Sequence, residues 1–412
     1  MLSPEPSLSA PVPYIFNTDE GRALCRQLIS KQLGYEPHSY QLDGVVRSLD
    51  KVDILAVTPT GSGKTGFLTM YLLVMHAIMK NPSLLPPNHR QPEHFRKDAG
   101  MVVVCPTKSL ESNMEPKFHS AGLSTLVINQ DTANAATLRG ENIWKQAPNV
   151  HVLIIAPEQL SSKGFERLLA NRDFQGRVVA IGVDEVHLLN TWGQTFREAF
   201  KQIAPAQKRF DYNPILILLT ATLRTGVAFN SVCAFMGLLP GHFHLIRRSN
   251  ARYDIRFIFR TVQSSSYAFR FPELDWVLQE KRKVIVFCPT IRVGFRVAVY
   301  LLEQKKAVVT VDEQIRMYNS LNWDSYNSET LRLMQTNPCP RVTIATDTLS
   351  VGIDIENIQD VVLYDFTLPA NTDDILQKAG RIRDGRKGAS RAIIYLPRSA
   401  METAQAVCKS IG

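Results

Sequence analysis

Short apolar runs recur along the chain, and amphipathic, helix-like stretches separate them. Strands that alternate with helices are typical of parallel α/β sheets. The pattern therefore predicts an α/β fold with two series of strands. The first series comprises residues 53–57, 101–105, 125–129, 151–156, 178–183 and 214–219. The second comprises residues 255–260, 283–288, 307–311, 342–346, 360–364 and 391–396.

A basic, polar stretch separates the two series and predicts a linker over residues 246–254. We therefore expect two tandem α/β domains with parallel sheets flanked by helices, over residues 14–245 and 255–412. Residues 1–13 are rich in proline and serine and are predicted to form a disordered lead-in. Residues 80–97 contain four prolines and little apolar content, which predicts an exposed loop.

Composition narrows the possible partners of this 412-residue chain. Lys and Arg number 47 against 38 Asp and Glu, a formal charge of +9, which favours a polyanion such as nucleic acid; a merely basic surface is the alternative. No apolar run approaches the roughly 18 residues of a membrane span. None of the six cysteines forms a C-x-x-C pair, so neither a zinc site nor a disulfide framework is indicated. We expect buried thiols and an intracellular, reducing compartment.

Residues 58–65 read Thr-Pro-Thr-Gly-Ser-Gly-Lys-Thr, the pattern of a phosphate-binding loop. An apolar run precedes them and a helix-like run follows, which is the context that such a loop requires. The glycines let backbone N–H groups turn toward phosphates, and the helix N-terminus adds positive potential. An ordinary turn is the alternative. The expected contacts to ATP are Thr60, Gly61, Ser62, Gly63, Lys64 and Thr65, with Thr65 also a ligand of Mg²⁺.

An acidic pair, Asp184 and Glu185, follows the apolar run 178–183. Asp184 is predicted to hold Mg²⁺, and Glu185 to orient the attacking water. Alone, such a pair is more often a solvated strand end; together with the phosphate loop it predicts hydrolysis of a nucleoside triphosphate, with Lys64, Asp184 and Glu185 as catalytic residues. We interpret His187 as a link from the acidic pair to the second domain, with a metal ligand elsewhere as the alternative.

Further segments arrive in the order of the motifs of a superfamily 2 helicase core, and within that superfamily the chain looks most like the RecQ family of DNA helicases. The resemblance covers roughly residues 30–400. It implies two tandem RecA-like domains, ATP and Mg²⁺ as cofactors, and 3′–5′ movement on single-stranded and partly duplex DNA in repair or recombination, in the nucleus if the organism is eukaryotic. The segments are residues 104–110, 155–160, 184–187, 219–222, 286–290, 345–348, 352–354 and 377–385.

The segment from Leu188 to Phe200 resembles the aromatic-rich loop with which RecQ helicases sense single-stranded DNA. Bases stack on Trp and Phe for about 1–3 kcal/mol each, and Arg adds charge. The alternative is that Trp192 and Phe196, four residues apart, are core residues. The residues expected to contact nucleic acid are Pro106, Thr107, Lys108, Trp192, Phe196, Arg197 and Thr346.

Residues 33–41 are similar to the adenine-reading segment of these helicases, although the family spacing is one residue longer. A glutamine amide both donates and accepts, so Gln41 can pair with adenine N6 and N7, and Tyr35 could stack on the ring. The resemblance also implies that Asp354 lies near the ribose.

The last family motif normally reads Gln-x-x-Gly-Arg-x-x-Arg. Here it begins at Gln377, and only one residue separates Arg381 from Arg383, so that Asp384 stands where the second arginine is expected. The resemblance implies catalytic roles for Gln377 and both arginines, because an arginine at the γ-phosphate is worth about 10³–10⁵ in rate in related systems. If Arg383 cannot reach that position, the chain is a weak or inactive ATPase.

Three functions therefore compete: a 3′–5′ DNA helicase, which we favour, an RNA-stimulated ATPase or RNA helicase, and a catalytically impaired protein that binds nucleic acid. RecQ proteins usually continue into a zinc module and a winged helix, and no cysteine cluster follows the last motif here. We expect either a minimal core or a fragment of a longer product, and no membrane association. Protein partners cannot be inferred from the sequence.

Overall fold

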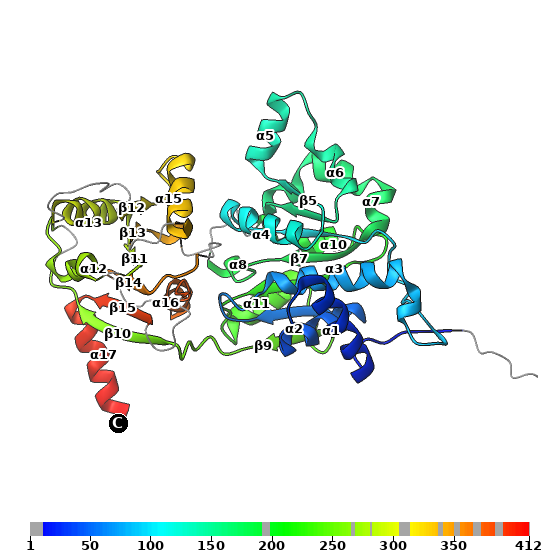
Figure 1. Ribbon diagram of the computed structural model, residues 1–412, viewed down its shortest axis with the longest axis horizontal. Coiled ribbons are helices and arrows are strands. Elements are labelled where there is room, and N and C mark those ends of the chain that lie inside the picture. The colour runs from blue at the N-terminus through cyan, green and yellow to red at the C-terminus, as the bar shows by residue number, and fades with distance from the viewer. Residues whose placement is uncertain are drawn as a thin grey trace, which may run out of the picture. The chain divides into compact units, whose positions relative to one another are not determined.

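The computed structural model describes residues 11–191, 198–264, 268–280, 282–304, 314–336, 341–349, 355–365, 372–383 and 390–411. The chain divides into two compact units, Met1–Ser249 and Asn250–Gly412, each built on its own sheet (Figure 1). Within the described residues, no helix is both long and apolar enough to cross a membrane.

All strand pairs of the larger sheet in the first unit are parallel, which confirms the predicted fold class there. Parallel sheets bury both faces, and accordingly the central strands are continuous apolar runs. In spatial order the strands are β5 (Thr125–Ile128), β6 (Val152–Ile155), β4 (Gly100–Val104), β7 (Val178–Val183), β8 (Ile215–Thr220), β2 (Asp53–Val57) and β9 (Phe243–Arg247).

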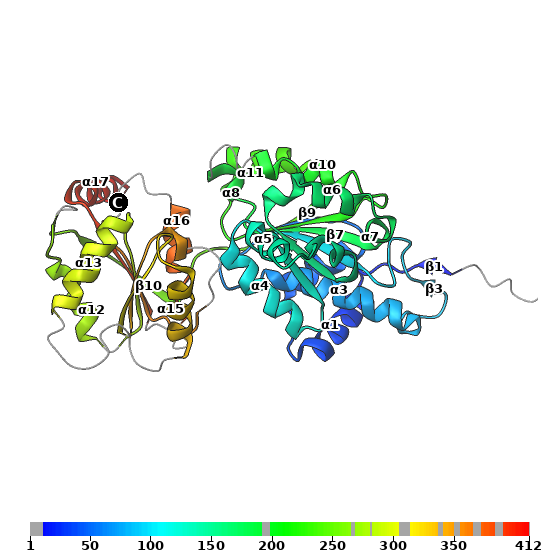
Figure 2. The ribbon, with the colours of Figure 1, turned by 90° about the horizontal axis from the view of Figure 1, so that it is seen from above.

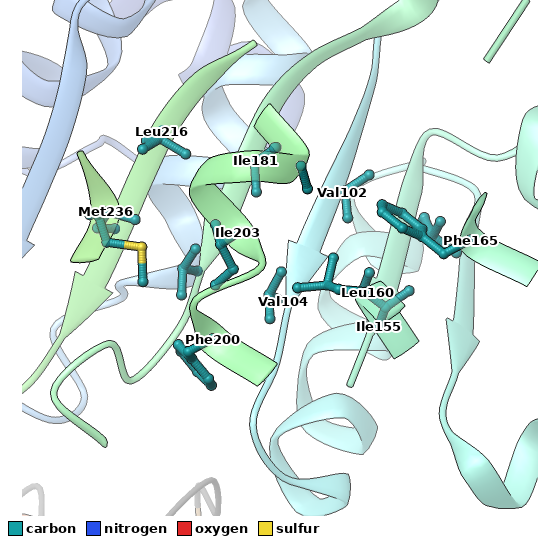
Figure 3. Packing of buried hydrophobic residues seen from close by; sticks show 14 of the residues in the cluster. Val102, Val104, Ile155, Leu160, Phe165, Ile181, Phe200, Ile203, Leu216 and Met236 are labelled. Carbon is teal, nitrogen blue, oxygen red and sulfur yellow. The ribbon is translucent and has the colours of Figure 1, made fainter. Parts of the chain in front are cut away.

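Helices cover both faces of this sheet (Figure 2). Alternate strand residues such as Val102, Val104 and Ile181 form a buried core with Phe165 and Ile203 from the helices on one face (Figure 3). That face carries α6 (Lys163–Leu169), α7 (Arg172–Arg177), α8 (Leu188–Thr191), α10 (Ile203–Gln207) and α11 (Val227–Met236). The other face carries α1 (Asp19–Leu33), α2 (Ser39–Leu49), α3 (Thr65–Lys80) and α4 (Lys108–Ser120), while α5 (Gln130–Leu138) follows β5.

The second unit is also a parallel sheet with an apolar core on each face. Its strands in spatial order are β10 (Ile255–Thr261), β15 (Ser390–Leu396), β14 (Asp360–Leu363), β11 (Val284–Phe287), β13 (Val342–Ala345) and β12 (Ile315–Tyr318). Its helices are α12 (Trp276–Gln279), α13 (Ile291–Gln304), α15 (Asp324–Thr336), α16 (Thr372–Ala379) and α17 (Arg398–Ile411).

Two edge strands, β9 and β12, are not predicted from the pattern of apolar runs. β9 is largely exposed at the end of its sheet, so it carries no buried apolar run. β12 contains Arg316, whose guanidinium is nevertheless buried against the Tyr326 ring at 3.8 Å and donates to Thr330. The predicted strand at residues 307–311 lies outside the described residues.

The boundaries expected from the sequence change in two places. β9 runs to Arg247, so the first two residues of the predicted linker 246–254 belong to a strand. In the predicted lead-in, Val12–Pro13 form β1 and pair with β3 (His89–Arg90).

That pairing belongs to a small anchored cluster within the predicted loop 80–97, most of whose residues are exposed as expected. Within residues 80–97, Leu85 and Phe95 are buried, and Phe95 stacks on Phe16 with ring centroids 5.5 Å apart. Two apolar anchors among many prolines are too few to alter the pattern that predicted exposure.

Three cysteines, Cys25, Cys105 and Cys288, are buried free thiols as predicted, and burial raises the pKa of each, that of Cys288 to about 12. Cys233 is half-buried, and Cys339 lies outside the described residues. Buried thiols of raised pKa are poor nucleophiles and poor metal ligands, so these positions serve packing.

Candidate nucleotide and nucleic-acid site

The loop between β2 and α3 has the backbone of a phosphate cradle. Gly61 and Gly63 have φ values of 81° and 75°, in the left-handed region that only glycine enters without strain. The Ser62 hydroxyl donates to Thr58 Oγ1 over 2.9 Å and closes the loop. Lys64 precedes the first residue of α3 and stays partly exposed, so both the ammonium and the helix N-terminus are available to an anion.

Two side chains of α2 hold this loop in place by donating hydrogen bonds to its backbone carbonyls. Gln41 Nε2 donates to the Gly63 carbonyl over 2.8 Å, and the Tyr40 hydroxyl donates to the Ser62 carbonyl over 2.5 Å. The contact is close, because a Cβ on Gly63 would lie 2.8 Å from Gln41 Nε2. A larger residue than glycine at position 63 would break this bracing.

The same bonds bear on the expectation for adenine. Gln41 Oε1 accepts from the His38 backbone N–H over 3.0 Å, so both halves of the amide are bonded to the chain. Each end of the amide has capacity for one further hydrogen bond, a second N–H on Nε2 and a second lone pair on Oε1, so these bonds position the side chain without using up the groups that would pair with adenine. Tyr35 is 52% exposed, which leaves its ring accessible for stacking.

The acidic pair lies at the same sheet edge as the phosphate loop, since both follow the carboxyl ends of parallel strands. Asp184 and Glu185 are both buried. Burial and the neighbouring Glu185 raise the pKa of Asp184 to about 6, although the Lys64 charge acts in the opposite direction. The structure thus brings together the lysine and the carboxylates that the sequence predicted separately.

Backbone geometry fixes the acidic pair. Glu185 has a φ of 48°, an uncommon value for a residue with a side chain, and its N–H donates to Asp184 Oδ1 over 2.9 Å. Non-glycine residues in such conformations cluster at functional sites, where the surrounding structure holds them. The strain therefore marks this turn as a functional candidate independently of sequence motifs.

The donor set fits Mg²⁺ held together with a nucleotide. Two buried carboxylates side by side repel each other, and a divalent cation would relieve that repulsion. Mg²⁺ is usually bound through one or two protein oxygens plus phosphates and water, and here Thr65 and Asp184 would supply the protein oxygens. In the part of the chain that the structure describes, no group of three or more His, Cys, Asp or Glu could hold a metal by itself.

His187 joins the acidic pair to the next strand. Its Nδ1 lies 2.8 Å from Thr220 Oγ1 and 3.3 Å from Glu185 Oε2. Thr220 in turn donates to the Thr222 carbonyl over 3.0 Å. These contacts lie inside the first unit, and the interpretation of His187 as a link to the second domain stays a prediction.

The first group of predicted nucleic-acid contacts follows β4. Thr107 caps α4 by accepting from the Leu110 N–H, and the Lys108 ammonium pairs with Asp131 at the start of α5. Behind them, Glu111 is buried and accepts from Asn129. Sequence reasoning missed Asp131 and Glu111, because their partners are 23 and 18 residues away.

The aromatic segment after the acidic pair is described only at its ends. Leu188, Leu189 and Phe200 are buried in the first unit. Trp192, Phe196 and Arg197 lie outside the described residues, as do Asp354 and Asp384 of the second unit. Pro106 lies directly between the end of β4 and the Thr107 cap.

The arginine motif begins with Gln377 in the last turn of α16 and continues past the end of that helix in the second unit. Gln377 and Arg381 are buried, and Arg383 Nη1 donates to the carbonyls of Gly380 and Ile382. Arg383 is therefore bonded to its own turn through Nη1, and the guanidinium carries further N–H donors on Nε and Nη2. Thr346 directly follows β13.

Comparison with known families agrees with this arrangement. Residues 39–228 match the DEAD/DEAH box helicase family, and residues 270–386 match the helicase conserved C-terminal domain. The chain is 24% identical over 379 residues to the ATP-dependent DNA helicase RecQ of Bacillus subtilis (strain 168), covering 90% of this chain and 56% of that protein. It is 25% identical over 367 residues to the ATP-dependent RNA helicase DBP2 of Gibberella zeae, covering 87% and 59%.

Solved structures show the same fold. The crystal structure of the DUF1998 helicase MrfA bound to DNA matches with a TM-score of 0.69 at 19% identity, over 94% of this chain and 52% of that one. Saccharomyces cerevisiae Dbp5 bound to RNA and ADP BeF3 matches with a TM-score of 0.64 at 14% identity, over 94% and 91%. The chain spans less than two thirds of the length of the RecQ and DBP2 relatives, and DNA and RNA helicases match it equally well.

Proposed function

The chain has the helicase core of superfamily 2, and from this premise we propose that it hydrolyses ATP to move along single-stranded DNA in the 3′–5′ direction and to separate duplexes. One observation carries the hydrolytic part. The Lys64 charge acts on Asp184, beside Glu185, at the edge of the sheet where the glycine loop opens.

Each of these side chains has a separate task in the proposed reaction. Gly61, Gly63 and Lys64 bind the phosphates, and Glu185 orients the water that attacks the γ-phosphate. Mg²⁺, when bound at Thr65 and Asp184, neutralises charge on the phosphates. Because Glu185 is buried and held by its backbone, it is positioned before the nucleotide arrives.

Gln377, Arg381 and Arg383 complete the proposed machinery from the second unit, with Asp354 near the ribose. The arginines would stabilise the charge that develops on the γ-phosphate. Their support is the match of residues 270–386 to the helicase C-terminal domain and the resemblance of residues 377–385 to the family motif.

The preference for DNA rests on the aromatic segment after the acidic pair, whose resemblance is to RecQ helicases. The RNA alternative rests on the DBP2 relatives, which are as similar to this chain as the RecQ relative. We therefore keep an RNA-stimulated ATPase as a second candidate.

The test is steady-state ATP hydrolysis with no nucleic acid, with a single-stranded DNA and with an RNA of the same sequence. Stronger stimulation by DNA supports the proposal, and stronger stimulation by RNA replaces it with the second candidate. Unwinding of duplexes with a 3′ or a 5′ tail then tests the direction of movement.

Two variants locate the activity. Lys64→Ala should abolish turnover while the melting temperature stays close to that of the wild type; unchanged hydrolysis would refute the nucleotide site.

Arg383→Ala should reduce ATP turnover strongly if this arginine, despite its shifted position in the motif, stabilises the γ-phosphate. Bound ATP without turnover in the wild type would instead support a catalytically impaired protein that binds nucleic acid.

A further inference from the structure

The turn between β12 and α15, residues 319–323, exposes two large apolar side chains. Leu321 is 77% exposed and Trp323 is 83% exposed. Neither contributes to the apolar cores of the second unit. A tryptophan this exposed contributes little burial energy to the fold, and its aromatic face is accessible to a ligand.

Three asparagines hold the backbone of this turn. The buried Asn319 accepts from the N–H groups of Leu321 and Asn322 over 2.9 and 3.2 Å. Asn322 donates to the Met317 carbonyl over 3.0 Å, and Asn327 donates to the Asn319 carbonyl over 2.9 Å. These hydrogen bonds therefore fix the backbone conformation of the turn.

A helical hydrogen bond of the first turn of α15 fixes the backbone of Trp323. The Trp323 carbonyl accepts from the Asn327 N–H over 3.0 Å, so Trp323 stands at the start of the helix. A ligand that stacks on it would lose little additional backbone entropy on binding.

The turn lies beside a residue expected to contact nucleic acid. Tyr318, the last residue of β12, pairs with Ala345 of β13, and the Thr346 N–H approaches the Tyr318 carbonyl at 3.4 Å. The chain thus leaves both strands at the same edge, toward Thr346 on one strand and toward residues 319–323 on the other (Figure 1). A strand that passes over Thr346 would pass next to the turn.

We propose that Trp323 is a stacking platform for a base of single-stranded nucleic acid bound along the carboxyl edge of the second sheet, with Leu321 as an apolar neighbour. This inference rests on the proposed function, since it assumes that Thr346 meets a nucleic-acid strand. Every base has a π-face, so stacking on tryptophan is strong and tolerant of sequence.

The charges of residues 319–324 favour stacking of bases over binding of phosphates. These residues include no lysine or arginine, and Asp324 is negatively charged, like a phosphate. The turn therefore offers an aromatic surface to bases and no cation to phosphates. Loss of Trp323 should weaken binding without changing its dependence on salt, because that dependence counts phosphate contacts.

The experiment measures the dissociation constant of the full chain for a short fluorescent oligo-dT and oligo-U at several salt concentrations. Trp323→Ala should bind about 5- to 150-fold more weakly, with the slope of log K against log salt unchanged. Trp323→Phe, which keeps an aromatic face, should recover most of the affinity. Melting temperatures of all variants confirm that the exposed substitutions leave the fold intact.

Tyr253 is the matched control, because it is 94% exposed and precedes β10, at the opposite edge of the same sheet. Tyr253→Ala should bind like the wild type. Equal affinities of Trp323→Ala and the wild type would overturn the inference and leave the turn to another partner, such as a protein. A wild-type chain that binds neither oligonucleotide would overturn the proposed function and this inference together.

Discussion

The Nδ1 atom of His187 lies 2.8 Å from Oγ1 of Thr220, and both residues are buried. His187 comes shortly after β7 and Thr220 ends β8, so this contact joins the exits of two paired strands. It connects the acidic pair, which would act on ATP, to the segment Thr220-Ala221-Thr222, which resembles the helicase motif that couples hydrolysis to movement.

Thr220→Val tests this connection, because valine keeps the branched shape and removes the hydroxyl. We expect ATP turnover to fall by about tenfold or more, roughly 1.4 kcal/mol in activation free energy, with ATP binding retained. Stability should fall by about 1–3 kcal/mol, since buried polar partners lose a bond. Thr220→Ser keeps the hydroxyl and should retain turnover; equal turnover in the valine variant and the wild type would show that the contact is structural only.

If Lys108 contacts the nucleic-acid backbone, as the sequence predicts, Asp131 competes with phosphate for its ammonium. The two side chains form an ion pair while remaining 57% and 65% exposed, so Asp131→Asn should change stability by less than about 1 kcal/mol. It should strengthen binding to single-stranded nucleic acid several-fold, because it removes a carboxylate that would compete with phosphate for the Lys108 ammonium. Lys108→Ala should weaken binding and reduce the salt slope by about one. If Asp131→Asn binds like the wild type, Lys108 does not contact the strand.

Glu111 gives a pH-dependent stability. Burial raises the pKa of this carboxyl above its usual range, an effect opposed by the bond from Asn129. The folded state therefore binds the proton more tightly than the unfolded state, and stability is lost as the pH rises through the raised pKa. Glu111→Gln removes that loss and can still accept from Asn129.

Thermal melting between pH 5 and 8 measures this effect. The melting temperature of Glu111→Gln minus that of the wild type should grow with pH and reach a few degrees, as about 1 kcal/mol gives in a domain of this size. Glu36→Gln, at an exposed position, should shift nothing, whereas Glu158 cannot serve as the control because its charge helps to raise the pKa of Glu111. A constant difference across the pH range would contradict the prediction.

Asp360 is the charged centre of the second unit. It is fully buried and accepts from Arg282 over 2.7 and 2.8 Å and from Arg391 over 3.0 and 2.6 Å. Asp360→Ala leaves two arginines without this partner and should destabilise the unit by about 3–5 kcal/mol. Denaturant unfolding measures the loss. Glu280→Ala, which removes a more exposed partner of Arg391, should lose clearly less, and equal losses would contradict the central role of Asp360.

Gln41→Ala separates bracing of the phosphate loop from reading of adenine. If Gln41 only braces the loop through Gly63, KM should rise by a similar factor for ATP and GTP. If it also pairs with adenine, the preference for ATP over GTP should fall about tenfold or more in the variant, because a site built around a base hydrogen bond discriminates strongly. Measuring kcat and KM for ATP and for GTP in the wild type and in Gln41→Ala distinguishes these outcomes.

The sequence by itself determined the features that depend on neighbouring residues. Apolar runs such as residues 53–57 and 178–183 predicted β2 and β7 with their observed bounds. The glycines of residues 58–65 predicted a loop that only positive φ angles allow, and Gly61 and Gly63 have them. A period of hydrophobicity and a turn are local properties, so a sequence contains them directly.

Tertiary structure decided the features that depend on distant residues. It assigned His187 to Thr220, Gln41 to Gly63 and Lys108 to Asp131, and it buried Arg316 in a strand that the sequence pattern did not predict. Each of these pairs is fixed by the order and register of the strands, which arise from packing of the whole sheet. Side chains that are far apart in the chain become partners only when that packing is complete, and no local pattern contains this information.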